Sequence, residues 1–334
     1  MVILLNLWYS NDKKVRAMLI QILLLVIGFI LLIKGADIFV DGASSTAENF
    51  HVSKILIGLT VVAFGTSAPE LAVSLKALSI GSTDMVLGNV IGSNITNGLL
   101  ILGVAVVIRS LTVKQNTVKK ELPLHMLISA LLVVLFLDKE INNLSPNMIS
   151  RSDAFAILLF FSVFLYYIIS ISRNKIDTDS ETGKYGLVKS LLFVVLGLIG
   201  IIYGSDLVVN SATKIAKSLG VTERVISLTI IAFGTSLPEL VTAIISSVKK
   251  EQDILMGNII GSNIFNICIV LGLPVAIYGS IIPASFQIID LIALITTSLL
   301  LYIIPKTNNY KITRKYGLLL ILLYIAYYTA VFII

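Results

Sequence analysis

The sequence predicts an all-α membrane protein with ten transmembrane helices arranged as two inverted five-helix repeats. Three observations support this fold: composition, continuous apolar runs and an internal repeat. Of the 334 residues, 57% are hydrophobic and only 13% are charged, whereas about a quarter of the residues are charged in a typical soluble domain. The apolar runs are long and continuous, which indicates membrane helices rather than the alternating strands of a membrane β-barrel.

Ten apolar segments approach the roughly 20 residues that a membrane-spanning helix needs. The predicted spans are residues 17–41, 53–80, 84–108, 121–137, 152–171, 187–212, 222–248, 252–278, 287–304 and 315–333. A polar segment at 172–186 separates the fifth span from the sixth. It divides the chain into a first repeat, residues 1–171, and a second repeat, residues 187–334.

The basic residues between the spans predict the orientation of the chain. Leaving out Lys34 inside the first span, 9 lysines and arginines lie on the side of the N-terminus and 15 on the opposite side. Basic residues collect on the cytoplasmic side of a membrane, so we expect extracellular termini and a cytoplasmic linker at 172–186. A prokaryotic plasma membrane is the expected location. The net charge of +6 reports this topology, and no nucleic-acid partner is expected.

Two motifs recur at a constant offset of 169 residues. Phe-Gly-Thr-Ser-x-Pro-Glu occupies 64–70 and 233–239, and Gly-Asn-x-Ile-Gly-Ser-Asn-Ile-x-Asn occupies 88–97 and 257–266. Five predicted spans separate equivalent positions, so the second copy enters the membrane in the opposite direction. Inverted repeats of secondary transporters place the substrate site near the bilayer midplane, where interrupted helices meet.

Glu70 and Glu239 are carboxylates inside otherwise apolar spans. Such residues are costly in hydrocarbon and are functional candidates by default. Calcium takes six to eight oxygen ligands, and two glutamates would balance the charge of one Ca²⁺. More than one Na⁺ is the alternative occupant, and ions that compete for one site make an exchanger.

A proline precedes each of these glutamates. Proline removes an amide donor and displaces the carbonyl four residues earlier, so Pro69 and Pro238 should free the carbonyl oxygens of Gly65 and Gly234. Irregular backbone at this depth is tolerated only where it lines a cavity or is buried in protein. We therefore expect a broken helix with exposed oxygens in each repeat.

In each copy of the second motif, three polar residues recur at intervals of four and share one helix face. They are Asn89, Ser93 and Asn97 in the first copy, and Asn258, Ser262 and Asn266 in the second. Their neutral oxygens suit Na⁺. Asn94 and Asn263 fall off this face, where hydrogen bonding between helices is the expected role. His51 and His125 have no partner cluster and no repeat equivalent, so neither is assigned as a metal ligand.

The paired Gly-Thr-Ser-x-Pro-Glu and Gly-Asn-x-x-Gly-Ser-Asn segments resemble the two alpha repeats of the sodium/calcium exchanger family, in its prokaryotic form, within the cation/calcium antiporter superfamily. The resemblance implies that Glu70 and Glu239 coordinate Ca²⁺ with the backbone carbonyls of Thr66 and Thr235. The implied sodium and central sites are formed by Ala63, Ser67, Ser93, Asn97, Ala232, Ser236, Ser262 and Asn266. It also implies alternating access, in which spans 17–41 and 187–212 slide over a fixed core.

The function expected from this resemblance is Ca²⁺/Na⁺ antiport through one shared site. Ca²⁺ and Na⁺ are then the substrates of a monomeric transport unit within the lipid bilayer, with no cofactor and no enzyme chemistry. Potassium-dependent relatives carry Asp at the position of Asn266, so we expect no K⁺ requirement. A Ca²⁺/H⁺ antiporter is the alternative, since the glutamates can also carry protons. A cation channel is a more distant alternative.

Overall fold

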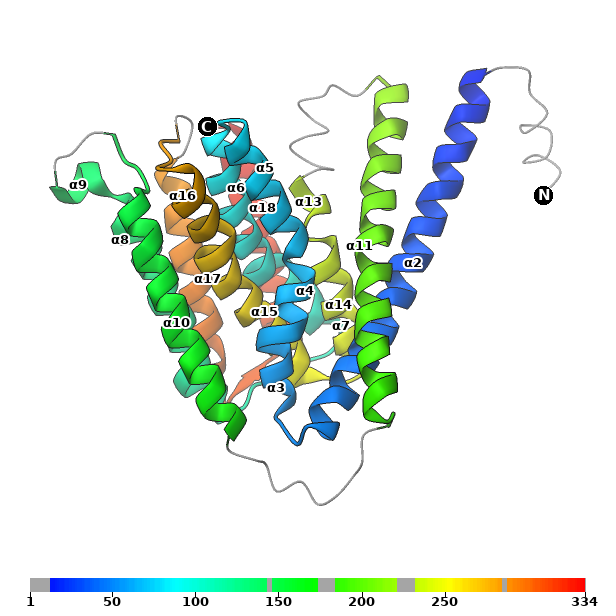
Figure 1. The fold of residues 1–334 in the computed structure, drawn as a ribbon, viewed down its shortest axis with the longest axis horizontal. Helices are drawn as coiled ribbons and strands as arrows, with labels where there is room; N and C mark the ends of the chain where they lie inside the picture. The colour runs from blue at the N-terminus through cyan, green and yellow to red at the C-terminus, as the bar shows by residue number, and fades with distance from the viewer. Residues whose placement is uncertain (1–12, 143–145, 174–183, 221–231, 284–286, 334) are drawn as a thin grey trace.

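The computed structural model describes residues 13–142, 146–173, 184–220, 232–283 and 287–333, and over these ranges it is almost entirely helical (Figure 1). The helices are α2 (Lys13–Asn49), α3 (Lys54–Ile57), η1 (Gly58–Val62), α4 (Ala63–Thr66), α5 (Ala68–Ser79), α6 (Thr83–Ile95), η2 (Thr96–Ile101), α7 (Leu102–Ile108), η3 (Thr117–Glu121), α8 (Leu122–Phe136), α9 (Asp138–Asn142), α10 (Arg151–Arg173), α11 (Leu187–Ser218), α13 (Ala232–Gly234), α14 (Leu237–Val248), α15 (Gln252–Phe265), η5 (Asn266–Leu271), α16 (Gly272–Tyr278), α17 (Ile288–Thr307) and α18 (Arg314–Ile333), where η marks a π-helical turn. Two short strands, β1 (Leu111–Thr112) and β2 (Lys311–Ile312), pair antiparallel. The predicted all-α class is confirmed.

Six helices in the described ranges are long and apolar enough to cross a membrane. Residues 54–66 and 68–79 add a seventh span if they are counted together, since they are bent by 44° at a break. Each predicted span coincides with helix wherever the structure describes it. Residues 222–231 of the seventh predicted span lie outside the described ranges. The chain is thus a multi-pass helical protein, as its composition indicates.

Burial separates central helices from peripheral ones. In the apolar windows of Thr83–Ile108 and Gln252–Tyr278, 72% and 83% of the residues are buried, compared with 11% in α2. The peripheral helices turn large apolar side chains outward, such as Ile30 on α2 and Leu196 on α11, each 56% exposed. A surface this apolar fits contact with lipid. The second motif is therefore fully buried at 257–266 and mostly buried at 88–97.

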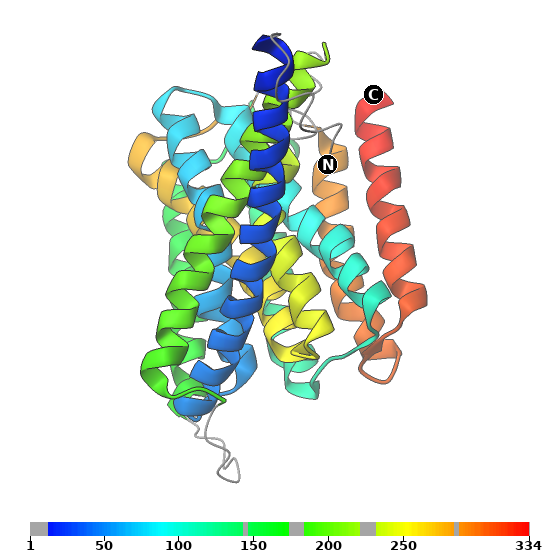
Figure 2. The same ribbon diagram turned by 90° about the vertical axis from the view of Figure 1, so that its right-hand side faces the viewer.

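α2 and α11 lie side by side over most of their length and stand at one side of the molecule (Figures 1 and 2). Glycines set their spacing. A Cβ atom on Gly35 would lie 2.7 Å from the amide nitrogen of Ile201, and one on Gly197 would lie 2.6 Å from that of Phe39. Small residues allow membrane helices to approach this closely. The two helices therefore form one tightly packed pair.

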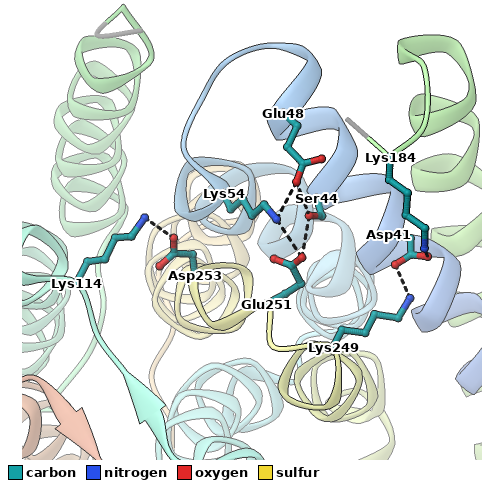
Figure 3. Close-up of polar contacts among 9 residues, drawn as sticks. All are labelled: Asp41, Ser44, Glu48, Lys54, Lys114, Lys184, Lys249, Glu251 and Asp253. Atoms are coloured by element: carbon teal, nitrogen blue, oxygen red, sulfur yellow. Dashed lines mark hydrogen bonds and ion pairs between the residues drawn. The ribbon is translucent and has the colours of Figure 1, made fainter. Parts of the chain in front are cut away.

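α2 extends beyond the predicted end of the first span at residue 41 and reaches Asn49. The added turns carry Ser44 and Glu48, which find polar partners (Figure 3). Ser44 donates a hydrogen bond to Glu251, and Lys54 forms ion pairs with both Glu48 and Glu251 at 2.9 and 3.0 Å. Because these polar side chains are paired, the helix continues past its apolar segment.

A second group of ion pairs joins α2 to the end of α14 (Figure 3). Lys249 pairs with Asp37 at 2.9 Å and with Asp41 at 2.5 Å, and Lys184 also contacts Asp41 at 3.2 Å. Asp37, which lies inside the first predicted span, thus has a structural partner. We call Asp37, Asp41, Lys184 and Lys249 the α2 ion-pair cluster. It fastens the α2–α11 pair to the rest of the molecule at one end.

The two broken helices run in opposite directions (Figure 1). The first passes from α3 through α4 to α5 toward one end of the molecule, and the second passes from α13 to α14 toward the other. Both breaks lie at the same level in the middle of the bundle. This arrangement brings the two Pro-Glu segments from distant parts of the chain to one region.

Candidate functional site

The break in each helix falls at a serine one residue before the start of the next helix. Ser67 has φ −88° and ψ 6°, and Ser236 has φ −87° and ψ 4°, so the two breaks share one backbone conformation. Proline follows at the second position of the next helix in both copies. Proline is tolerated in the first turn but disrupts a continuing helix. The predicted break is therefore confirmed in both repeats.

Glu70 and Glu239 lie in the first turns of α5 and α14. A helix N-terminus favours a negative charge there. Their exposed fractions are 1% and 2%, and Ser67, three residues before Glu70, hydrogen-bonds to Glu239. The sequence motif thus places two acidic side chains from opposite repeats in one buried region.

The hydrogen bonds to these carboxylates differ. Glu239 accepts a hydrogen bond from the Ser67 hydroxyl through Oε1 at 2.9 Å. Its Oε2 and both oxygens of Glu70 have no hydrogen-bond partner within the part of the chain that the structure describes. A buried carboxylate needs a cation, a proton or a donor to offset its desolvation. Three carboxylate oxygens are therefore available to a bound cation.

Thr66 and the second motif of the other repeat are joined by hydrogen bonds. The Thr66 hydroxyl donates to Asn258 Oδ1 at 3.2 Å, and the Ser262 hydroxyl reaches the same oxygen at 3.3 Å. In the first repeat, Asn89 donates to the backbone carbonyl of Glu70 at 3.1 Å. The polar faces expected from the spacing of four therefore lie against the broken helices.

Glycines of the second motif make this close approach possible. A Cβ atom on Gly257 would lie 2.6 Å from the carbonyl oxygen of Ile55, and one on Gly261 would lie 2.7 Å from that of Leu59. No side chain fits at either contact without moving the backbone. α15 of the second repeat is thereby packed directly onto the broken helix of the first.

Asn97 and Asn266 both lie in π-helical turns, η2 and η5. Single π-helical turns within α-helices occur frequently at functional sites. Asn97 is 1% exposed and Asn266 is fully buried. Asn97 Oδ1, and both polar atoms of the Asn266 side chain, lack a partner among the described residues. The π-helical turn found in both repeats thus places one asparagine from each in the interior, and the side-chain oxygen of each has no partner among the described residues.

The other predicted sodium-site residues are also found in or near the interior. Ala63, Ser93, Ser236 and Ser262 are all buried. Thr235 lies in the turn between α13 and α14 and is partly exposed. Ala232 begins α13, and its side chain is outside the part of the chain that the structure describes.

One expectation about the broken helices is wrong for the second repeat. The carbonyl oxygen of Gly234 accepts a hydrogen bond from the Ser205 hydroxyl of α11 at 3.1 Å. It is thus paired with the protein rather than left open for an ion. The sequence gives no signal for this contact, because Ser205 belongs to a different helix and no motif. The bond instead links α11 to the break.

His125, which the sequence does not assign as a metal ligand, has a hydrogen-bond partner that the sequence does not reveal. His125 is 1% exposed on α8, and its Nε2 lies 3.2 Å from Asn263 Nδ2. Asn263 was expected to bond between helices, and it does so with Asn97 at 3.0 Å. No spacing rule links residues 125 and 263, which are 138 positions apart.

The ligand chemistry of the site is that of oxygen. The described residues contain no group of three or more His, Cys, Asp or Glu side chains that could hold a metal ion. Carboxylate, hydroxyl and amide oxygens are the groups that hard cations such as Ca²⁺ prefer. The arrangement is suited to binding and releasing such an ion.

The chain matches the sodium/calcium exchanger protein family over residues 20–170 and 189–333. It is 31% identical over 349 residues to the sodium/calcium exchanger MaX1 of Methanosarcina acetivorans, covering 94% of this chain and 99% of that one. It is 39% identical over 281 residues to the inner membrane protein YrbG of Escherichia coli K12, covering 81% and 84% of the two chains. Among solved structures, it resembles the sodium-calcium exchanger NCX_Mj soaked with 10 mM Na⁺ and zero Ca²⁺. That match has a TM-score of 0.82 and 32% identity, and covers 92% of this chain and 98% of that one. The chain belongs to the sodium/calcium exchanger family of membrane transporters.

Proposed function

We propose that the chain is a secondary active antiporter that exchanges Ca²⁺ for Na⁺ by alternating access through one shared site. The observation that carries this proposal is the pair of buried carboxylates, Glu70 and Glu239, with three unpartnered oxygens among the described residues. Two such groups repel each other unless cations or protons neutralise them. One Ca²⁺ or several Na⁺ ions satisfy this requirement, so the two ions compete.

The proposed architecture has ten spans in two inverted halves, residues 1–171 and 187–334, joined by a linker at 172–186. The offset of 169 residues between the motifs and the opposite directions of the two broken helices (Figure 1) support it. Inverted repeats of this kind alternate access by moving one group of helices against the other around a fixed site.

In this proposal, Glu70, Glu239 and the backbone carbonyls of Thr66 and Thr235 bind Ca²⁺. The proposed sodium and central sites comprise Ala63, Ser67, Ser93, Asn97, Ala232, Ser236, Ser262 and Asn266. The contacts of Ser67 with Glu239 and of Thr66 with Asn258 support a common location for the two sets. Neutral oxygens around two carboxylates provide ligands for Na⁺ without an additional fixed charge.

The α2–α11 pair is the part proposed to move. Its polar contacts with the rest of the chain include the Ser205–Gly234 hydrogen bond, the α2 ion-pair cluster, and the bonds of Ser44 and Glu48. Glycine contacts along its length keep its two helices together. Movement of this pair past the breaks would change which side of the membrane reaches the glutamates.

The proposed orientation places both termini outside the cell and the linker in the cytoplasm of a plasma membrane. Lys54, Lys114, Lys184 and Lys249 gather at one end of the molecule (Figure 3). This clustering supports the orientation, since basic residues accumulate on the cytoplasmic side.

Calcium uptake into proteoliposomes tests the proposal. With Na⁺ inside the vesicles and none outside, the purified chain should accumulate Ca²⁺, and replacement of K⁺ by choline should leave the rate unchanged. A pH gradient alone should drive no uptake. Uptake driven by pH alone would establish the Ca²⁺/H⁺ antiporter instead, and flux that needs no counter-gradient would establish a channel.

A further inference from the structure

His125 belongs to a chain of hydrogen bonds that ends in the proposed site. Its Nε2 lies 3.2 Å from Asn263 Nδ2, and Asn263 Oδ1 accepts a hydrogen bond from Asn97 Nδ2 at 3.0 Å. The three side chains come from α8, α15 and η2, and each is at most 1% exposed. The outermost helix of this group is thus connected to an asparagine in the interior.

As the amides are placed in the structure, the hydrogen bonds run from Asn97 through Asn263 to His125. An amide has one oxygen, which accepts, and one nitrogen, which donates. Because Asn263 uses its oxygen to accept from Asn97, its nitrogen faces the histidine, and His125 Nε2 must accept. Asn97 therefore donates through its side-chain nitrogen to Asn263, and the Oδ1 atom of Asn97 has no partner among the described residues. The carbonyl end of Asn97 remains free for a cation.

The second repeat shows the same positions without a histidine. The residues 169 positions from Asn97 and His125 are Asn266 and Leu294, and leucine accepts no hydrogen bond. Asn94, the counterpart of Asn263, donates to Val90 O of its own helix at 2.7 Å. Asn266 has no hydrogen-bond partner for either amide atom among the residues described. The second repeat, which has no histidine at this position, therefore also lacks the hydrogen bond between the two asparagine side chains among the described residues.

The backbone that carries His125 is itself held in place. The Ser129 hydroxyl of α8 donates to the His125 carbonyl oxygen at 3.0 Å, and Ser298 of α17 donates to the Ser129 hydroxyl at 2.9 Å. Both serines are at most 1% exposed. α8 is thus bonded to α17 next to the histidine, whose Nδ1 is buried without a hydrogen-bond partner among the described residues.

We propose that His125 is a positioning residue that, through Asn263, holds the Asn97 carbonyl oxygen available to the transported cation. The inference rests on the proposed function, in which Asn97 belongs to the central site. It makes the two repeats unequal: Asn97 supplies an oriented oxygen, whereas Asn266 is free to reorient as ions exchange. Loss of the histidine should therefore weaken cation binding and leave the rate of turnover nearly unchanged.

His125→Leu tests this role, because it gives the first repeat the residue found at the equivalent position of the second. In proteoliposomes, the Na⁺ concentration for half-maximal Ca²⁺ flux should rise about threefold, as expected for a lost buried hydrogen bond. The maximal rate should stay within about twofold of the parent. His125→Gln should restore the affinity, since its side-chain oxygen can accept from Asn263.

Two further variants separate positioning from a general packing defect. In an Asn97→Ala background, His125→Leu should have no additional effect on the Na⁺ requirement, because it acts only through Asn97. Leu294→Ala, a buried apolar change at the matched position, should lower thermal stability without changing the Na⁺ requirement. Additive effects of His125→Leu and Asn97→Ala would overturn the inference.

The same experiment distinguishes failure of the inference from failure of the proposed function. If Asn97→Ala raises the Na⁺ requirement and His125→Leu does not, the inference is wrong and the exchanger assignment stands. If the parent protein shows no Na⁺-dependent Ca²⁺ flux, the proposed function itself fails.

Discussion

The two repeats have nearly the same backbone at the site but different hydrogen bonds. Their breaks share one conformation at Ser67 and Ser236, and each has a π-helical turn at its asparagine. In the first repeat, Asn97 is held by a neighbouring amide and Glu70 is without a partner among the described residues. In the second, Glu239 is held by Ser67, and Asn266 is the residue without one.

This difference indicates which properties the repeat sequence preserves. Proline precedes the glutamate in both copies and both helices break, whereas the close contacts of Gly257 and Gly261 have no counterpart at Gly88 and Gly92. The side-chain hydrogen bonds differ: Ser67 donates to Glu239 whereas Glu70 accepts none among the described residues, and Leu294 stands at the position equivalent to His125. In the proposed site, each repeat would thus contribute one oxygen ligand held by a hydrogen bond and one without such a bond.

The largest effect should come from the carboxylates, despite their different hydrogen bonds. Removal of one member of a buried charged group costs about 3–5 kcal/mol, so Glu70→Gln or Glu239→Gln should reduce the initial rate of Ca²⁺ uptake by about 100-fold or more. Both variants should fold, because glutamine has nearly the same shape. Near-normal uptake in either purified variant would refute a shared site.

Ser67→Ala should have the next largest effect, because it removes the donor to Glu239. A hydrogen bond to a charged group contributes about 1.5–3 kcal/mol, which predicts roughly tenfold weaker Ca²⁺ affinity. Ser236→Ala is the matched control, since Glu70 accepts no hydrogen bond among the described residues. Ca²⁺ titration of both variants compares the repeats directly. Equal losses would show that the Ser67–Glu239 bond does not distinguish them.

Asn97→Ala and Asn266→Ala extend the comparison to the neutral ligands. We expect about a fivefold rise in the Na⁺ requirement for Asn97→Ala and about twofold for Asn266→Ala, because an oriented ligand loses more than an adjustable one. Na⁺-dependent Ca²⁺ flux measures both. A larger rise in the Na⁺ requirement for Asn266→Ala than for Asn97→Ala would contradict the assignment of Asn97 as the oriented ligand and Asn266 as the adjustable one.

The smallest effect should come from the α2 ion-pair cluster, which lies away from the glutamates. Partly exposed ion pairs contribute about 0–1 kcal/mol each, so Lys249→Ala should change the maximal rate about twofold without changing Ca²⁺ affinity. Lys120→Ala is the control, since this exposed lysine forms no ion pair with the described residues. A large change in Ca²⁺ affinity for Lys249→Ala would place the cluster in the binding site rather than in the moving pair.

The helical segments and the breaks could be predicted from the sequence because both depend on local chemistry. A long apolar run predicts a membrane-spanning helix, and Pro69 predicts the break at Ser67, just before α5 begins. The prediction missed the extension of α2 to Asn49, because Glu48 is acceptable there only through its pairing with Lys54. It also missed the partner of His125, since Asn263 lies on another helix. Contacts between distant helices leave no periodic signal in a single sequence.

Calcium binding to the purified chain at increasing Na⁺ concentrations tests the shared site most directly. Isothermal titration should show the apparent Kd for Ca²⁺ rising with Na⁺, and no Ca²⁺ binding in Glu70→Gln or Glu239→Gln. Na⁺ should raise that Kd more steeply than in proportion to its concentration, because more than one Na⁺ replaces one Ca²⁺. Calcium affinity that does not change with Na⁺, or that survives loss of either glutamate, would contradict exchange through one site.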